Sequence, residues 1–241
     1  MKKNEQSFAV ETYQTQATGE IHIHTLMQYL QESASEHAHK LGWGYDNLKE
    51  MNCYWVLVNF KIMLKRLPKW REKFTVQTWP SGRDRLKACR VFLGLDSEGK
   101  ELFTAGSDWM ILDAGDNRPK NLNEVALNFS VKGDRLIKNL KRLRPREKYK
   151  KMDCIKIPYS AVDINGHVNN TEYIRWGTDI LKTCRREMGK IRSVHISFLS
   201  EIFENEEMEL LVHEDETAET FSVLGKRKND EKNIFLLEFG F

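Results

Sequence analysis

The chain has 241 residues, of which 40% are hydrophobic and 30% charged, and its net charge is +3. Together with a mean hydropathy of −0.58, these values are typical of a soluble globular protein with one large or two small domains. No apolar run approaches the roughly 18–20 residues that a membrane span needs. The charge is too small to indicate nucleic-acid binding by itself.

The N-terminus and the cysteines bear on location and on metal binding. The first residues include two lysines but no apolar stretch, so we expect no secretory signal. The four cysteines are scattered, without a C-x-x-C pair or a histidine at zinc-ligand spacing. We therefore expect a cytoplasmic protein with reduced thiols, no metal and no cofactor.

The first regular pattern is a helix over 25–41. Thr25 and Gln28 match the T-x-x-Q capping box, which satisfies unpaired N–H groups of a first helical turn. Gly42 follows the last apolar residue and is expected to end the helix. The apolar stripe, at a period near 3.6, consists of Leu26, Met27, Leu30, Ala34, Ala38 and Leu41.

Four strand-like runs follow this helix, separated by turn residues. Turns are predicted at Ser81-Gly82 and over 96–99. The runs are 53–64, 73–79, 86–95 and 101–112.

The second half repeats this order. A helix is predicted over 169–188, with Asn169 as its N-cap, Glu172 three residues later and Gly189 at its end. Short strand-like runs, 8–14 and 156–160, precede the two helices. Four further runs follow the second helix, at 191–203, 207–214, 219–225 and 233–241.

One helix wrapped by a long antiparallel sheet is an α+β solution, and its repetition predicts a duplicated domain. We expect an N-terminal domain over 1–113, a polar connector over 114–150 and a C-terminal domain over 151–241. The connector leads into a basic segment, KNLKRLRPREKYKK, at 138–151. Such a segment is usually a solvated surface.

The densest chemical motif is DINGHVNNTEYIRW, residues 163–176. Asp163, Asn165 and His167 alternate directly before the second helix. Asp and Asn often form turns by binding their own backbone, so the motif by itself is compatible with a purely structural turn.

The motif resembles the signature of the acyl-acyl carrier protein (acyl-ACP) thioesterases, which comprise plant plastid enzymes and bacterial relatives. The resemblance extends over nearly the whole chain: TLMQYLQESASEHA resembles the family's first helix, and SVHISFLSEIF resembles the segment that carries its catalytic glutamate. It implies a tandem double hotdog fold, in which the N-terminal hotdog shapes the acyl-chain pocket.

The resemblance also implies a site. Carried over by position, the catalytic residues are Asp163, Asn165, His167 and Glu201. Asn169 and Asn170 are the expected substrate-binding residues; Asn169 is also the expected cap, and Asn170 could equally close the turn.

Two positions depart from the plant pattern. Ile202 stands where plant members commonly have a cysteine after the glutamate, so a thiolate mechanism is not available there. Gly166 replaces a common glutamine, which removes no catalytic group.

The chemistry expected of these residues is thioester hydrolysis. Glu201, predicted late in a strand with Leu199 and Phe203 on its face, and Asp163 would activate water. Asn165 and His167 would hold the hydrogen-bond network, and amides at the helix N-terminus would bind the oxyanion. Direct attack by a carboxylate remains an alternative. Glu201 also opens an acidic run that could be a solvated strand end.

The implied function is release of free fatty acid from acyl carrier protein, which terminates fatty acid synthesis. The alternatives are an acyl-CoA thioesterase and a non-catalytic acyl-thioester-binding hotdog protein. The basic segment would dock the acidic carrier protein. We expect no nucleic-acid or membrane partner, and a homodimer is allowed but not required.

The approach to the first helix, EIHIHT, weakly matches DINGHV, with Glu20 in the place of Asp163 and with His22 and His24 nearby. We interpret it as a degenerate remnant, because the Asn pair and the late-strand glutamate have no counterpart in the first half.

Overall fold

The computed structural model describes residues 3–125, 136–137, 140–185 and 189–241. The chain divides into two compact units, Met1–Leu140 and Lys141–Phe241. The predicted connector, 114–150, spans this division. Its residues 126–135 and 138–139, and the predicted end of the second helix at 186–188, lie outside the described residues.

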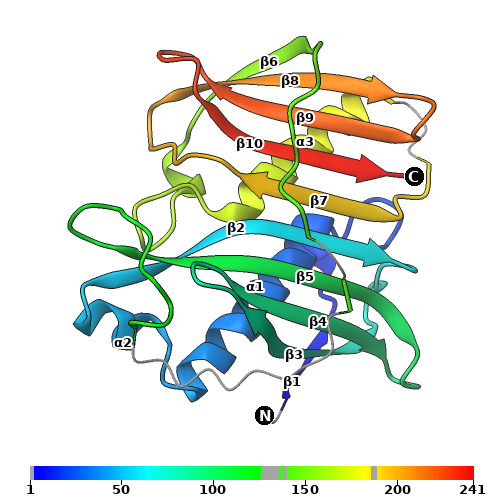
Figure 1. Cartoon of the computed structure of the whole chain (residues 1–241). Helices are drawn as coiled ribbons and strands as arrows, with labels where there is room; N and C mark the ends of the chain where they lie inside the picture. Colours follow the sequence, from blue (N-terminus) through cyan, green and yellow to red (C-terminus); the bar gives the residue numbers. More distant parts are fainter. Residues whose placement is uncertain (1–2, 126–135, 138–139, 186–188) are drawn as a thin grey trace. The chain divides into compact units, whose positions relative to one another are not determined.

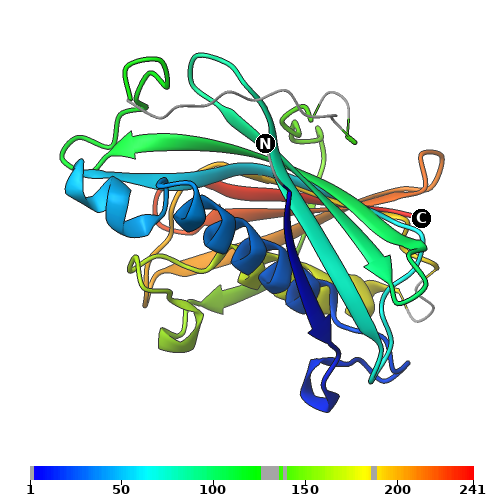
Figure 2. The same ribbon diagram turned by 90° about the horizontal axis from the view of Figure 1, so that it is seen from below.

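The first unit is a five-stranded antiparallel sheet with a helix along one face (Figures 1 and 2). The strand order is β1-β3-β4-β5-β2. The elements are β1 (Asn4–Ala9), the short 3-10 helix η1 (Thr12–Gln14), α1 (Ile23–Lys40), α2 (Tyr45–Glu50), β2 (Cys53–Leu64), β3 (Lys73–Arg83), β4 (Ala88–Asp96) and β5 (Glu101–Asp113).

Helix α1 forms where the apolar spacing predicts it but begins earlier. Its N-cap is His22, which makes no side-chain capping bond, and Thr25 is buried within the first turns. The predicted capping box at Thr25 is therefore wrong, because Ile23 is already helical and adds its side chain to the buried stripe.

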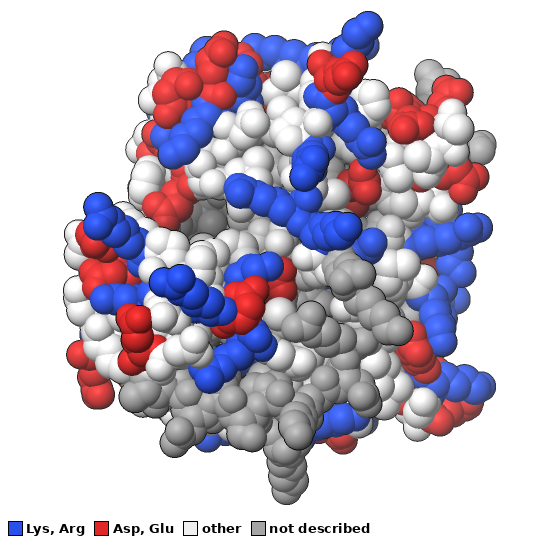
Figure 3. Space-filling model, in the orientation of Figure 1, with Lys and Arg blue, Asp and Glu red and all other residues white. Residues whose placement is uncertain are grey.

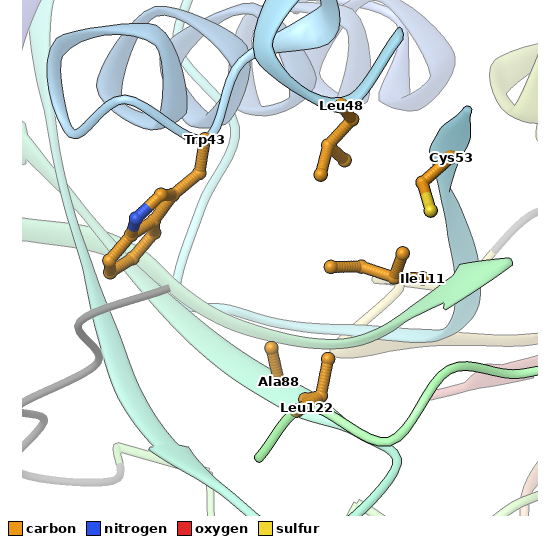
Figure 4. Close-up of a cluster of buried hydrophobic side chains, with 6 residues drawn as sticks. All are labelled: Trp43, Leu48, Cys53, Ala88, Ile111 and Leu122. Atoms are coloured by element: carbon orange, nitrogen blue, oxygen red, sulfur yellow. The ribbon is translucent and has the colours of Figure 1, made fainter. Parts of the chain in front are cut away.

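Helix α2 was not predicted, and it closes a local core at one end of the first sheet (Figure 4). With one buried residue, Leu48, it lacks a helical apolar period. The indole N–H of Trp55 donates to the Trp43 carbonyl at 2.9 Å, which fixes the chain before α2. The cluster consists of Trp43, Leu48, Cys53, Ala88, Ile111 and Leu122.

The turn predicted at Ser81-Gly82 lies instead inside β3. The register shifts between Pro80 and Gly82, so the glycine follows an irregularity in the strand. The chain reverses at 84–87, where the Asp84 carboxylate accepts from the N–H groups of Leu86 at 2.9 Å and Lys87 at 2.7 Å.

A buried cation lies between α1 and the sheet of the first unit. Arg90 Nη1 is 3.0 Å from Nδ1 of His37 and 3.3 Å from Oγ1 of Thr78. Burial lowers the pKa of Arg90 to about 10. Burial, and then the charges of Arg90 and Lys40, lower the pKa of His37 to about 4, so His37 is held as the neutral imidazole.

The second unit repeats the first. Its strand order, β6-β8-β9-β10-β7, matches that of the first unit element by element, and α3 lies against the sheet (Figure 1). The elements are β6 (Lys150–Lys156), η2 (Tyr159–Ala161), α3 (Asn170–Cys184), β7 (Ser193–Phe198), β8 (Glu207–Asp215), β9 (Thr220–Arg227) and β10 (Asn233–Gly240). The predicted repeat of a helix and a long antiparallel sheet is confirmed.

Helix α3 lies close to β10. A Cβ at Gly177 would clash with the side chain of Leu237, so the glycine permits this approach. The helix ends at Cys184, earlier than the predicted 188. Within the described ranges, no helix combines the length and apolar character that crossing a membrane requires.

Candidate functional site

The motif before α3 folds into a closed turn. Main-chain bonds of 2.9 Å join Asp163 N to His167 O and Gly166 N to Asp163 O. The Asp163 carboxylate accepts from the Asn165 N–H at 2.8 Å. Asp163 thus has the turn-forming role that its residue type predicts, and Asn165 lies on the exposed part of the turn.

Gly166 supplies the left-handed residue that this turn requires. Its φ is +76°, and a Cβ there would meet no atom within 4 Å. Gly19 has the corresponding place before α1, with φ +79° and the same open surroundings. A substitution at either glycine therefore acts through backbone conformation and not through a clash.

Gly166→Ala is expected to lower the free energy of unfolding by about 1 kcal/mol, because an L-residue resists this conformation. It should also reduce turnover about tenfold, because the relaxing turn carries His167. Gly19→Ala is the matched control: chemical denaturation should show a similar stability loss and kinetics should show unchanged turnover. Equal turnover in the two variants would contradict a role for the second turn.

Asn169 caps α3, as predicted. Its Oδ1 accepts from the Thr171 N–H at 3.0 Å and from the Thr171 hydroxyl at 2.8 Å, and its carbonyl accepts from the Glu172 N–H at 3.0 Å. These contacts commit two amides of the first turn to the cap. Asn170 is the first helical residue and is half-buried.

Glu201 lies in a loop and not late in a strand, so this part of the prediction is wrong. Strand β7 ends at Phe198, and the Leu199 and Ser200 N–H groups both bond to the Ile234 carbonyl, at 2.8 and 3.1 Å. Because two successive N–H groups share one carbonyl, the regular hydrogen-bond pattern between β7 and β10 ends here, and the chain leaves the strand.

In this position Glu201 faces His167. Its Oε2 is 3.7 Å from His167 Nε2, with side chains 39% and 31% exposed, respectively. The ring of Phe203 packs against His167, with 5.3 Å between ring centroids. The pair is therefore open to solvent and bordered by an apolar ring. A carboxylate beside an imidazole can accept or relay a proton from water.

Tyr173 lies one turn into α3. It is 4% exposed and packs against Phe198 and Phe235. Its pKa is raised mainly by burial and further by the negative charges of Glu201 and Asp163, while Arg227 opposes the shift. A single phenol thus experiences the charges of both expected catalytic carboxylates.

From the sequence, Tyr173 is assigned only to the helix predicted over 169–188, and Arg227 is assigned no role. The signal for Tyr173 was a hydroxyl-bearing ring in the buried stripe directly after the polar motif. Arg227, at the end of β9, has no motif in the sequence that marks it.

The equivalent turn before α1 corrects the comparison of the two halves. Its bonds, Gln16 N to Glu20 O and Gly19 N to Gln16 O, both 2.9 Å, repeat those of Asp163, His167 and Gly166. Gln16, not Glu20, therefore holds the place of Asp163. Thr18, Glu20 and His22 hold the places of Asn165, His167 and Asn169.

The position after Glu201 holds no thiol. Ile202 is fully buried, and the cysteines are elsewhere. In the part of the chain that the structure describes, no three His, Cys, Asp or Glu side chains converge in a way that could hold a metal ion.

Comparison with known proteins shows the family of the chain. A sequence model described as the acyl-ACP thioesterase N-terminal domain matches residues 1–128, and one described as the acyl-ACP thioesterase C-terminal domain matches residues 145–236.

Plant proteins are among the relatives. The chain is 26% identical to a chloroplastic palmitoyl-acyl carrier protein thioesterase of Arabidopsis thaliana over 211 residues, covering 81% of the chain and 51% of that protein. It is 30% identical to the Cuphea hookeriana protein of the same name over 189 residues, covering 71% of the chain and 45% of that protein. The chain thus spans about half the length of these relatives.

Solved structures cover the whole fold. An acyl-ACP thioesterase from Bacteroides thetaiotaomicron superposes with a TM-score of 0.90 at 26% identity, covering 99% of this chain and 97% of that one. A 12:0-ACP thioesterase from Umbellularia californica, at 18% identity, superposes with a TM-score of 0.82, covering 98% and 95% of the two chains. The expected tandem double hotdog fold is therefore confirmed.

Proposed function

Because the chain belongs to the acyl-ACP thioesterase family, we propose that it hydrolyses the thioester of acyl-acyl carrier protein and releases free fatty acid, which terminates fatty acid synthesis. The observation that carries this proposal is the solvent-open pair of His167 and Glu201 at the turn before α3. Family membership supports the substrate class, and the pair supports the hydrolytic chemistry.

In the proposed mechanism, Glu201 takes a proton from a water molecule that His167 and the exposed Asn165 help to position. The water oxygen attacks the thioester carbonyl carbon, and the collapse of the tetrahedral intermediate expels the thiolate of the carrier's prosthetic arm. The proton held by Glu201 then passes to that thiolate. Asp163 holds the turn through the Asn165 N–H and adds negative charge near the same phenol as Glu201.

The oxyanion is the second requirement of this chemistry. The positive end of the α3 dipole favours a developing negative charge at the helix start. The Asn169 cap commits the Thr171 and Glu172 amides, so these two amides are not the donors. We assign this role to the dipole together with the side chains of Asn165 and His167, with Asn170 as a substrate-binding residue at the first helical position.

We further propose a division of labour between domains. The C-terminal domain, 151–241, carries the catalytic groups, and the N-terminal domain, 1–113, shapes the pocket for the acyl chain. The first turn supports this assignment, because Gln16, Thr18 and Glu20 occupy the places of Asp163, Asn165 and His167.

The direct test is release of free thiol from acyl carrier proteins loaded with C8 to C18 chains, run beside the matching acyl-CoAs. Wild type and Asp163→Ala are compared. Multiple turnovers on carrier-protein substrates, lost in the variant, would support the proposal. Turnover with acyl-CoA alone would show that acyl-CoA, and not the acyl carrier protein, carries the substrate. Stoichiometric binding without thiol release would favour the acyl-binding alternative.

The basic segment, residues 138–151, is the proposed docking surface for the acidic carrier protein. Its residues 141–151 are held on the second unit by the Leu143 N–H, which donates to Ser197 Oγ at 2.9 Å, and by an Arg146–Glu238 ion pair at 2.9 Å. In Figure 3 lysine and arginine side chains gather along the path that this segment follows in Figure 1. The exposed cations of this segment would steer an acidic partner.

Replacing Arg142, Arg144 and Lys148 by glutamine is expected to raise KM for acyl-ACP several-fold while leaving KM for acyl-CoA within about twofold. These residues are exposed and take part in neither contact above. The control replaces three exposed cations of the first unit, Lys49, Lys73 and Arg85, with the same change in net charge. Equal effects of the two triple variants, or equal effects on both substrates, would rule out docking at this segment.

A further inference from the structure

The loop that carries Glu201 has a structural counterpart in the first unit. After β2, the Lys65 and Arg66 N–H groups both bond to the Leu102 carbonyl, at 2.9 and 3.2 Å. After β7, Leu199 and Ser200 bond to Ile234 in the same way. Leu67 therefore holds the place of Glu201, and Arg66 holds the place of Ser200.

Both loops are closed by an equivalent glutamate. The Glu72 carboxylate accepts from the Lys69 N–H at 2.9 Å, and the Glu206 carboxylate accepts from the Phe203 N–H at 2.8 Å. The residues before these glutamates, Arg71 and Asn205, have positive φ values of 64° and 66°. The backbone path is thus the same in both units, although one loop carries a proposed catalytic group and the other does not.

An arginine binds each loop, but it comes from a different element in each unit. In the first unit, Arg66 within the loop donates to the Leu67 carbonyl at 3.4 Å and forms two hydrogen bonds with Glu72, at 2.8 and 2.7 Å. It also contacts Asp96, at the end of β4, at 3.3 Å.

In the second unit, Ser200 stands at the position of Arg66, and Arg227 stands at the position of Asp96. Arg227 pairs with Met208 across β8 and β9 as Asp96 pairs with Phe74 across β3 and β4. From this strand end its guanidinium donates to the Glu201 carbonyl. Its Nε is 3.5 Å from Glu206, and its Nη1 is 3.2 Å from Asp230.

The two units therefore differ in how deeply the positive charge of the arginine is buried. The Arg66 side chain is 40% exposed, whereas the Arg227 side chain is 14% exposed. The cation of the second unit is therefore the more buried of the two, and it pairs with the carboxylates of Glu206 and Asp230. The residue that precedes Glu201 is Ser200, which carries no charge. Arg227 also opposes the shift in the pKa of the buried Tyr173, which is consistent with a cation close to that phenol.

We propose that Arg227 is a positioning residue: its guanidinium holds the main chain of Glu201 so that the carboxylate faces His167. This inference rests on the proposed function, because it identifies the residue that holds the proposed general base, Glu201, in position. A planar guanidinium suits this role because it has several N–H donors: Nη2 donates to the Glu201 carbonyl, while Nε and Nη1 pair with carboxylates.

The test compares Arg227→Met and Arg227→Lys with Arg66→Met, which removes the corresponding contact in the first unit. Arg227→Met is expected to lower kcat about tenfold or more with KM changed less than about threefold, because a displaced base affects the chemical step more than binding. Arg227→Lys, which keeps the charge, should recover part of kcat. Arg66→Met should cost stability but leave kcat within about twofold.

Hydrogen–deuterium exchange over 199–206 is the readout that does not need activity. Arg227→Met is expected to accelerate exchange there; unchanged exchange would overturn the inference even if the wild type released no thiol. Wild-type kcat in a folded Arg227→Met variant, or equal losses of kcat in the Arg227 and Arg66 variants, would also overturn it. Failure of the proposed function would appear separately, as absence of thiol release by the wild type.

Discussion

Glu201→Ala is expected to lower kcat/KM for acyl-ACP by at least about 100-fold, which corresponds to about 2.7 kcal/mol of transition-state stabilisation. The carboxylate is the group that faces His167 across the open site, at 3.7 Å. Because the side chain is 39% exposed, its removal should change the free energy of unfolding by less than about 0.5 kcal/mol. Thiol-release kinetics and denaturant unfolding measure the two effects separately.

Glu204→Ala is the matched control, because Glu204 is an exposed carboxylate of the same loop. It should retain turnover close to that of the wild type. Glu201→Gln, which preserves shape but cannot accept a proton, should be as impaired as the alanine variant. Near-normal turnover of Glu201→Ala would remove Glu201 from the mechanism and leave His167 without its proposed partner.

A second large effect is expected on stability between pH 6.5 and pH 4. His37 has a pKa of about 4 in the folded protein against an ordinary value of 6.5, so the unfolded chain binds its proton first. The stability present above pH 6.5 is therefore lost progressively as the pH falls toward 4. Linkage gives a loss of about 2 kcal/mol between pH 7 and pH 5 from this one group.

His37→Asn isolates this contribution. An asparagine oxygen can take the place of Nδ1 as acceptor from Arg90 but does not titrate. The variant should lose about 2 kcal/mol less than the wild type between pH 7 and pH 5. His39→Asn, at an exposed position of the same helix, should lose as much as the wild type. Identical pH dependence of wild type and His37→Asn, measured by denaturant unfolding, would contradict the buried neutral imidazole.

The architecture was readable from the sequence because its strands are long and its helices amphipathic. The prediction for 53–64 coincides with β2, and 101–112 differs from β5 by one residue. The elements that were predicted wrongly or not at all depend on local effects that do not change the periodicity of apolar residues. Helix α2 buries one residue, and Gly82 continues a strand after a register shift instead of turning the chain.

The site was readable only in part. Asp163, Asn165 and His167 are adjacent in the sequence, so their common turn could be predicted. Glu201 was found through the family resemblance, but its loop geometry depends on the shared Ile234 acceptor, which belongs to another strand. Arg227 depends on pairing between β8 and β9, which no local pattern of the sequence specifies.

The presence of two structurally matched units in one polypeptide has an evolutionary consequence. In a symmetric assembly of two identical chains, every substitution occurs twice, so a change that suits one copy must be tolerated by the other. Here each unit is encoded separately. The loop arginine can therefore differ between the units, with Arg66 in the loop of the first and Arg227 on a neighbouring strand of the second. Likewise, His167 faces a glutamate while the corresponding position of the first unit holds Glu20.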